Sequence, residues 1–386
     1  MNILLTDSLQ RKTLAATRSL GKSGENVFVA ESTRFNATAF SKYASKFLLS
    51  PNPNEDAESY FNWLIEAVIK YEIDLLIPMD NASMEIVVSR QEALKKITKV
   101  FIPAYEDYLV ATDKGNAVKC AMNAGVQTPK SHFVNSFDEL LSIEKKLKFP
   151  IVIKPRRSWG SRGIRIVNDW QTLLSTYQEI TKDYENPILQ EYIPQGTRYD
   201  VCLLFDDRHH VTASFVQKEL RQFPEPLGPS TIQESTKQDQ LLAASIKMMS
   251  QLSWVGIAEL EFMENPENQQ FYFMEINTRF WASLQCAIFS GVDFPLLYKK
   301  AAFNEHEECH DYQLGIKCRW LFPGDLLRLL TEGRRVKWIP PFWVGKRQGV
   351  LDDTFDLHDP MVMLGFTLSV LRYIFDIKMW KAIFWR

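Results

Sequence analysis

The chain has 386 residues, of which 46% are hydrophobic and 24% charged, a composition typical of a globular protein with two or three domains. Its net charge of −2, without runs of like charge, argues against an electrostatic nucleic-acid binder. The five cysteines are odd in number and lack CxxC spacing, which argues against a disulfide framework or a cysteine zinc site. The N-terminus lacks the basic start and long apolar region of a signal peptide, so we expect a cytoplasmic protein.

The first 108 residues alternate between strand and helix patterns. Strands are expected at residues 2–6, 26–30, 74–78 and 99–102, and helices at residues 11–20, 57–70 and 82–95. This order predicts a parallel sheet in a Rossmann-like domain. The first turn, residues 6–12, has no glycine to approach a pyrophosphate, so we do not predict NAD. Asp80 and Asn81 follow a strand where such sheets bind ligands, although a helix cap explains them better.

A phosphate-binding loop is indicated between residues 149 and 167. Strands at residues 151–154 and 164–167 flank a loop with Gly160, Ser161 and Gly163, whose backbone N–H groups suit an anion. Lys154 ends the first strand, and four arginines lie nearby, at positions 156, 157, 162 and 165. A surface turn with scattered arginines would look the same. Lys114, in the first turn of the helix after Asp113, either faces an anion or is solvated.

The next segment suggests a purine site. A strand at residues 188–192 passes through Pro194 and Gly196 into a strand at residues 198–205. Such a linker can offer backbone groups to the edge of a purine while Ile193 packs on its face. A domain crossing without a ligand would look similar.

A strand at residues 211–218 brings Lys218 toward the same region. Residues 224–235 are rich in turn formers and are expected to form a flexible loop with substrate contacts. A helix is expected at residues 238–252.

A hairpin is expected from residues 257–263 and 270–276, joined by a turn at residues 265–268. Alternation can place Glu261, Glu275 and Asn277 on one face, close enough to share a hard cation. An ordinary hairpin with both glutamates solvated is the alternative.

The order of these parts resembles the ATP-grasp superfamily, and more narrowly its carboxylate-amine ligases that are similar to half of a carbamoyl-phosphate synthase large subunit. The motifs that carry the resemblance are DK at 113–114, IVIKP at 151–155, GSRGI at 160–164, QEYI at 190–193, GIAELEF at 256–262 and MEINTRFW at 274–281. The resemblance covers about residues 2–300, and the motifs are specific through their shared order.

The resemblance implies a mixed α/β fold with four parts. A Rossmann-like pre-ATP-grasp domain would cover residues 1–108, linker helices and a lid lobe residues 109–188, and a C-lobe with the metal site residues 189–302. Residues 303–386 would form a helical C-terminal extension.

The resemblance also assigns roles. Lys114 and Lys154 would bind the phosphates of ATP, and Gly160, Ser161 and Gly163 would form the mobile loop that covers them. Glu191 and Ile193 would form the hinge that contacts adenine, Lys218 would contact the terminal phosphate, and Arg279 would face the transferred phosphate. The Mg²⁺ (or Mn²⁺) ions would be held by Glu261, Glu275 and Asn277. Arg198 stands where many members have an acid for the ribose, and Asp200 is a substitute on the same face.

The implied enzyme phosphorylates a small-molecule carboxylate with ATP, and an amine attacks the acyl phosphate. The alternatives are a biotin-carboxylase-like or carbamoyl-phosphate-forming activity, and a non-catalytic ATP-binding regulator. A homodimer is compatible with the resemblance and the apolar C-terminus.

The C-terminal part is less informative. A strand is expected at residues 315–322 and a short helix at residues 325–331. Residues 361–386 are apolar, but Arg372, Asp376, Lys378 and Lys381 interrupt them before a membrane span is complete. The segment either lies on a membrane surface or packs against protein, and we favour protein because its charges do not share one helical face.

Overall fold

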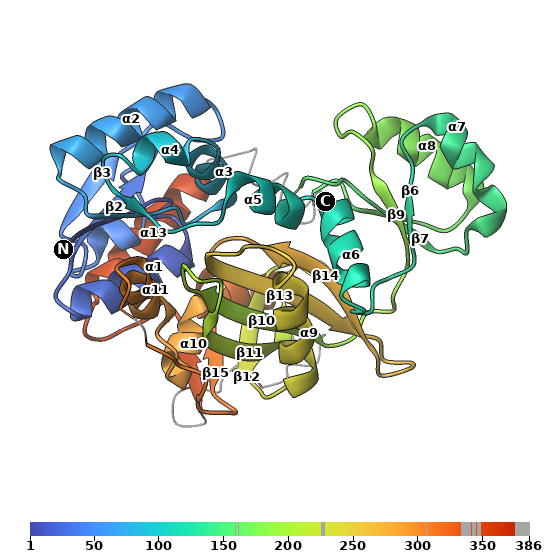
Figure 1. The fold of residues 1–386 in the computed structure, drawn as a ribbon. Helices are drawn as coiled ribbons and strands as arrows, with labels where there is room; N and C mark the ends of the chain where they lie inside the picture. Colours follow the sequence, from blue (N-terminus) through green and yellow to red (C-terminus); the bar gives the residue numbers. More distant parts are fainter. Residues whose placement is uncertain are drawn as a thin grey trace.

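The computed structural model describes residues 1–158, 160, 162–224, 228–305, 307–332, 341, 345 and 349–374. In this part of the chain the strands form sheets of five, seven and four strands. Figure 1 shows the five-stranded and four-stranded sheets at opposite ends of the molecule, with helices α5 (Tyr105–Thr112) and α6 (Lys114–Asn123) between them. The mixed α/β class expected from the sequence is confirmed.

The N-terminal sheet is parallel, in the order β3-β2-β1-β4-β5. Its strands are β1 (Asn2–Leu5), β2 (Asn26–Glu31), β3 (Lys46–Leu49), β4 (Leu75–Ile77) and β5 (Lys99–Val100), accompanied by α1 (Arg11–Lys22), α2 (Ala57–Lys70), α3 (Asn81–Ser89), α4 (Gln91–Leu94) and the turn η1 (Thr38–Phe40). The predicted parallel sheet is confirmed, and β3 was not predicted. Strand order reverses between β1 and β4, and Asp80 follows β4 at this switch point, where sheets of this kind bind ligands.

The four-stranded sheet is antiparallel, in the order β6-β9-β7-β8. Its strands are β6 (Ser131–Phe133), β7 (Ile151–Lys154), β8 (Arg165–Val167) and β9 (Ile188–Glu191), with α7 (Phe137–Ser142), α8 (Trp170–Ile180) and the turn η2 (Glu144–Lys146). The predicted pairing of β7 with β8 is confirmed. Leu140, Ile153, Leu173 and Leu189 belong to a core of this lobe's own residues, so the lobe is a separately packed unit.

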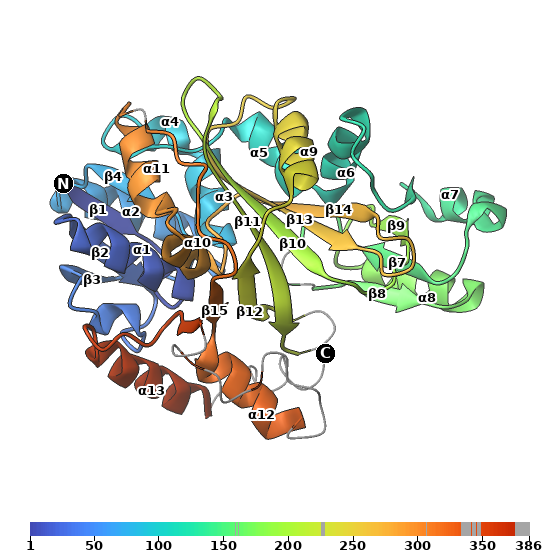
Figure 2. The ribbon, with the colours of Figure 1, turned by 90° about the horizontal axis from the view of Figure 1, so that it is seen from below.

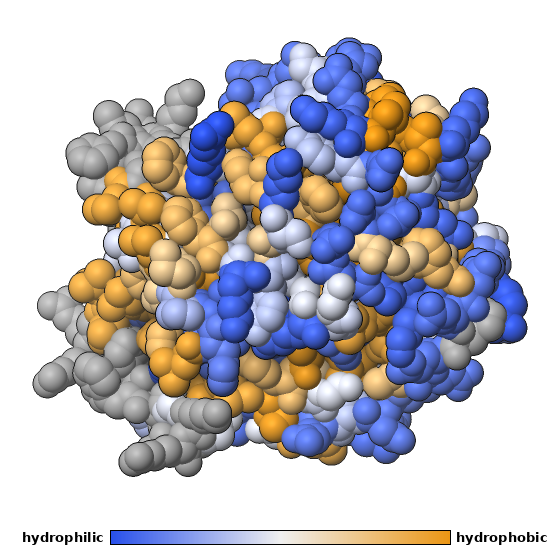
Figure 3. Space-filling view, turned by 90° about the vertical axis from the view of Figure 1, so that its left-hand side faces the viewer, coloured by the Kyte–Doolittle hydropathy of each residue, from blue (hydrophilic) through white to orange (hydrophobic). Residues whose placement is uncertain are grey.

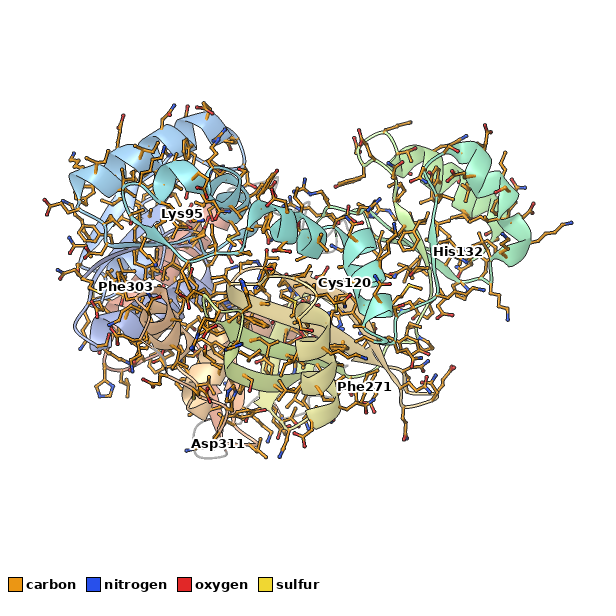
Figure 4. The ribbon with its side chains drawn as sticks, in the orientation of Figure 1. Lys95, Cys120, His132, Phe271, Phe303 and Asp311 are labelled. Carbon is orange, nitrogen blue, oxygen red and sulfur yellow. The ribbon has the colours of Figure 1, made fainter. Side chains whose placement is uncertain are left out.

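The seven-stranded sheet has the order β14-β13-β10-β11-β12-β15-β16. Its strands are β10 (Arg198–Phe205), β11 (Val211–Gln222), β12 (Ser230–Ser235), β13 (Gly256–Glu264), β14 (Phe271–Asn277), β15 (Lys317–Arg319) and β16 (Val350–Asp352). One face packs against α6 and α9 (Asp239–Met249), where Figure 4 shows Cys120 and Phe271. Figure 2 shows α10 (Leu284–Ser290) and α11 (Phe294–Ala302) between the other face and the N-terminal sheet.

The two large sheets share one apolar core. It contains Ile3 and Val29 from the N-terminal sheet, Phe215 and Ile257 from the seven-stranded sheet, and Trp281 from the loop before α10. Because interiors are closely packed, this shared core fixes the position of the N-terminal domain against the larger sheet.

One prediction for this sheet was wrong. Residues 224–235 were expected to be a flexible loop, but residues 230–235 form β12, which pairs with β11 on one side and β15 on the other. The strand was overlooked because its buried side chains are polar, including Thr231, Gln233 and Ser235.

The C-terminal extension returns to the N-terminal domain. It contains the turn η3 (Leu321–Asp325), α12 (Leu326–Glu332) and α13 (Met361–Ile374). Asp359 and Asp356 pair with Arg18 (2.9 Å) and Lys22 (3.5 Å) of α1. Val362 and Phe366 of α13 pack with Leu14, so this part of the segment packs against protein, the arrangement favoured from the sequence for residues 361–386.

Some apolar side chains of α13 stay exposed. Met361, Leu364 and Leu371 are each about half exposed, and Figure 3 shows apolar side chains gathered on this side of the molecule. The remaining residues of the predicted apolar segment, 375–386, lie outside the described residues. Among the helices that the structure describes, none is long and apolar enough to cross a membrane.

Candidate active site

The β13–β14 hairpin forms the centre of the site. Its register places Glu261 opposite Glu275 and Glu259 opposite Asn277, and residues opposite each other share a face. The predicted hairpin and the common face of Glu261, Glu275 and Asn277 are confirmed. Asn277 Nδ2 donates to Glu261 Oε1 (2.7 Å) and Glu259 Oε2 (3.0 Å). Rotating the amide by half a turn would present Oδ1 instead, so these residues fit an oxygen-liganded cation.

Two lysines approach this hairpin from neighbouring elements. Lys114 of α6 has Nζ 3.0 Å from Glu275 Oε2, and Lys154 at the end of β7 is buried. Burial lowers the pKa of Lys154 to about 8, against the opposite influence of Glu275. Burial works to raise the pKa of Glu275, but Lys114, Lys154 and Arg279 together hold it below its usual value. At this end of the hairpin the negative charge of Glu275 is therefore offset by nearby lysine and arginine side chains.

These groups line a cleft with about 870 Å³ of empty space, part of it open to solvent, between the four-stranded and seven-stranded sheets. Its apolar walls come from both sheets and the linker between them, and include Val152, Ile164, Ile166, Ile193, Met263 and Met274. The predicted site residues that line the cleft are Lys114, Lys154, Glu191, Ile193, Glu261 and Glu275. A slot with apolar walls and charged groups at one end suits a flat ring that carries anionic groups.

Two glycines of the predicted phosphate loop adopt backbone conformations that favour glycine. Gly160 and Gly163 have φ of +63° and +74°, a region that side chains rarely adopt. At Gly163 a Cβ would also lie 2.6 Å from Pro155 Cγ. Ser161, the third predicted residue of this loop, lies outside the described residues.

The loop starts against the first turn of α6. Asp113 caps this helix by accepting from Asn116 N (2.9 Å) and also accepts from Arg156 Nε (2.9 Å). Lys114 Nζ donates to the carbonyl of Ser158, and Lys114 N to that of Arg156. These contacts hold the loop beside the lysine end of the cleft.

A further set of acids follows on the same face of the large sheet. Asp200 lies opposite Glu261 on β10, Glu219 lies on β11, and Glu259 is two residues before Glu261. Burial first, then neighbouring acids, raises the pKa of Asp200 to about 8 and that of Glu259 well above its usual value. Burial also raises the pKa of Glu219 to about 7 and that of Glu261 to about 8.

Glu219 and Glu259 were not recognised as site residues from the sequence. The available signal was strand alternation, because Glu259 and Glu261 are two residues apart and so share a face.

Within the described ranges, no three His, Cys, Asp or Glu side chains are grouped closely enough to hold a metal ion.

Register separates Lys218 from this face. Gln217 lies opposite Asp200, whereas Lys218 lies opposite Tyr199, on the face that packs against α9. Lys218 Nζ is 3.1 Å from Glu234 Oε2. The structure therefore does not bring Lys218 to the predicted terminal phosphate position, because a shift of one residue along a strand moves a side chain to the other face.

The predicted ribose contact is not supported either. Asp200 is 4% exposed and accepts from Gln217 Nε2 at 2.8 Å, so it is enclosed in the sheet face. Arg198, in contrast, lines the cleft, and its Nη1 is 3.7 Å from Glu219 Oε2. The arginine therefore occupies the rim position next to the cleft.

Arg279 connects the hairpin to the start of α3 in the N-terminal domain. Its Nε lies 3.2 Å from Asn81 Oδ1 and 3.5 Å from Asp80 Oδ1. Asp80 is the N-cap residue of α3, as predicted, and its Oδ1 also pairs with Lys12 Nζ at 2.9 Å. Burial, followed by the charge of Arg279, lowers the pKa of Lys12 to about 8.

Comparison with known proteins matches residues 113–303 to the ATP-binding domain of the carbamoyl-phosphate synthase L chain. Biotin carboxylase 1 of Bacillus subtilis is 26% identical over 38% of this chain and 35% of its own length. D-alanine–D-alanine ligase B of Pseudomonas putida is 24% identical over 44% of this chain and 55% of its own length. The chain thus spans between a third and somewhat over half of the length of these curated relatives.

A solved structure extends the similarity beyond this domain. Biotin carboxylase from Campylobacter jejuni, described as a β-γ-ATP complex, superimposes with a TM-score of 0.70 and 21% identity, covering 82% of this chain and 74% of the other. At this identity the likeness establishes the fold. Residues 113–303 accordingly match the ATP-binding domain of the carbamoyl-phosphate synthase L chain, and this match supports the resemblance to the ATP-grasp superfamily.

Proposed function

We propose that this protein is an ATP- and Mg²⁺-dependent ligase that activates a carboxylate as an acyl phosphate for attack by an amine. The observation that carries the proposal is the cleft itself, in which apolar walls lead to Lys114, Lys154, Glu261 and Glu275. Apolar walls suit a purine, lysines suit phosphates, and paired carboxylates suit Mg²⁺ that is shared with those phosphates.

In this proposal the base of ATP lies between Ile193 and the apolar walls, beside the backbone that follows Glu191. Lys114 and Lys154 bind the phosphates, and the loop with Gly160, Ser161 and Gly163 covers them. Glu261, Glu275 and the amide oxygen of Asn277 would hold Mg²⁺ or Mn²⁺, which supplies charge neutralisation at the phosphates. Arg279 faces the transferred phosphoryl group, and Lys218 has no part.

The chemistry needs positioning rather than a nucleophilic side chain. A carboxylate oxygen attacks the terminal phosphorus of ATP, so ADP leaves and an acyl phosphate forms. The amine then attacks the acyl carbon, the C–O bond to phosphate breaks, and the amine loses a proton. Lys114, Lys154 and Arg279 offset the negative charge in both steps without first having to reorganise.

The test is Mg²⁺-dependent ADP release with pooled amino acids and small carboxylates. We expect one pool to stimulate release, and both Lys154→Ala and Glu275→Gln to reduce it by about 10²-fold or more, because each removes a charge that the transition state needs. Glu264→Gln is the matched control, since this glutamate lies on β13 with its carboxylate toward Tyr199 (3.4 Å). A non-catalytic regulator would instead bind ATP without stimulated release in any pool.

A carboxylase-type reaction is the second candidate. It is favoured by the similarity to biotin carboxylase 1 and by the matching family model. Bicarbonate is then the carboxylate that ATP activates. Bicarbonate-dependent ADP release that needs no other carboxylate would identify this reaction.

We also propose that the molecule forms a homodimer, because one solved structure with this fold is described as a domain dimer. Membrane contact by the apolar C-terminal segment is the less favoured role of that segment. Sedimentation of the full chain, with and without liposomes, addresses both proposals.

A further inference from the structure

A second cavity lies between α1 of the N-terminal domain and the helices α10 and α11, which Figure 2 shows side by side. It has about 530 Å³ of empty space, part of it open to solvent, and sites for small molecules measure about 300–1,000 Å³. No described residue lines both this cavity and the cleft that contains Lys154 and Glu275. We call it the helix cavity, and its ligand would not be a substrate held in the cleft.

The helix cavity contains polar atoms without partners in the described part of the chain. Gln285 of α10 is 9% exposed, and its side-chain amide forms no hydrogen bond with a described residue. Asp293 caps α11, and its Oδ1 accepts from Ser19 Oγ (2.5 Å) and Leu296 N (3.3 Å). Its Oδ2 accepts from none of the described residues. Enclosed polar groups normally have partners, so the amide and Oδ2 indicate a ligand that brings N–H groups.

A cation lies at the same cavity. Lys22 ends α1, and its Nζ pairs with Asp356 at 3.5 Å while half of the side chain is exposed. Such a pair is weak, so the ammonium can turn toward a ligand. Burial raises the pKa of Asp293, and Lys22 is among the groups that lower it, so the two charges act on each other. Arg18, on the same wall, is instead fixed by Asp359 at 2.9 Å from its Nε.

The remaining wall of the helix cavity is apolar. It includes Ala15 of α1, Ile288 of α10 and Leu296 of α11. A simple anion would be repelled by Asp293, and a simple amine by Lys22. A molecule that carries both charges close together, next to an apolar group, satisfies all three parts of the wall. An α-amino acid with an apolar side chain has this arrangement.

We propose that the helix cavity binds a free α-amino acid with an apolar side chain. Its carboxylate pairs with Lys22, and its ammonium donates to Asp293 Oδ2 and Gln285 Oε1. Its side chain packs on Ile288 and Leu296. The amino acid contacts α1 on one side and the helices beside the seven-stranded sheet on the other, so it joins two domains. This site does not depend on the proposed ligase function.

The test is calorimetry on the full chain without nucleotide. The probes are L-valine, L-leucine and L-phenylalanine, with 3-methylbutylamine and 4-methylpentanoate as analogues of leucine that lack one charge. At least one amino acid should bind, and neither analogue should. Asp293→Asn keeps a helix cap but removes the charge, so it should weaken binding by about tenfold or more. Lys22→Gln should weaken it by about fivefold, because this lysine is half exposed.

Two control variants separate this site from its surroundings. Lys22 and Lys42 lie over the ring of Tyr43, at 5.4 and 5.1 Å, but Lys42 does not line the helix cavity. Lys42→Gln should therefore change amino-acid affinity by less than about twofold. Lys154→Ala should also leave it unchanged, because this lysine lines the cleft.

Three results would overturn the inference. The first is failure of all three amino acids to bind, and the second is equally tight binding of either leucine analogue, since both charges are then not required. The third is binding that Lys154→Ala abolishes while Asp293→Asn and Lys22→Gln leave it intact, because the amino acid would then lie in the cleft. Loss of binding in both helix-cavity variants, with both controls unchanged, supports the site.

Discussion

Two buried acids in this protein have opposite surroundings. Asp359 of the C-terminal extension is 1% exposed and accepts hydrogen bonds from Arg18 Nε (2.9 Å), Ser41 Oγ (2.7 Å) and Lys42 N (2.9 Å). Asp200 is as deeply buried, but its donor is one glutamine amide, and its neighbours on the sheet face are acids. The first acid is fully partnered within the protein and the second is not.

This difference distinguishes a structural acid from a functional one. Asp359 joins the C-terminal extension to α1, so its charge is neutralised as the chain folds. Asp200 forms no salt bridge with a residue that the structure describes, so folding alone leaves this carboxyl unfavourably placed. Natural proteins tolerate such a cost mainly at sites that bind or react.

The largest expected effect on stability comes from the structural acid. Asp359→Asn should lower the free energy of unfolding by about 3–5 kcal/mol, because Arg18 would keep a buried charge without its partner. Asp356→Asn is the matched control, since it pairs with the exposed Lys22 at 3.5 Å and should cost about 0–1 kcal/mol. Urea denaturation measures both. Equal losses would show that burial does not distinguish the two pairs.

The opposite sign is expected for the functional acid. Asp200→Asn should raise the free energy of unfolding of the ligand-free protein by about 0.5–2 kcal/mol, because it removes a carboxyl whose ionisation is opposed by burial and by the charge of Glu219. Asp206→Asn, just after the same strand, should lower it, since Asp206 accepts from Arg208 Nη2 (3.0 Å) and His210 N (2.8 Å). Thermal unfolding without nucleotide compares them. A loss of stability in Asp200→Asn would mean that Gln217 alone satisfies this carboxylate.

Much of the fold could be predicted because its signals are local. Helix α2 and strands β7 and β10 begin and end where the sequence pattern placed them. The failures were at β12, whose buried polar side chains resemble a loop, and at β3, which was not predicted. Strand β3 pairs with β2, and β12 pairs with both β11 and β15, and periodicity does not reveal these pairings.

The site was predictable where residue type and strand parity agree. Glu261 and Glu275 are opposite each other, and Lys114 and Lys154 approach them, as their motifs implied. Lys218 was misplaced because its strand was identified without its register, and one residue decides the face. Alternation along β13 places Glu259 on the face of Glu261, but its burial depends on the neighbouring strands, which the sequence alone does not show.

Stability is also expected to depend on pH. The pKa of Asp200 is raised to about 8 and that of Glu219 to about 7, both chiefly by burial, against about 4 in an unfolded chain. The folded state therefore binds more protons, so stability is highest below about pH 4 for these groups and falls as pH rises to about 8. Buried Lys12 and Lys154, with pKa lowered to about 8, act in the opposite direction only above that pH. The unfolding temperature should thus decrease between about pH 5 and 8, and Asp200→Asn should flatten this slope. An equal slope in the variant would mean that the acids on the sheet face already have their counter-charges in the free protein.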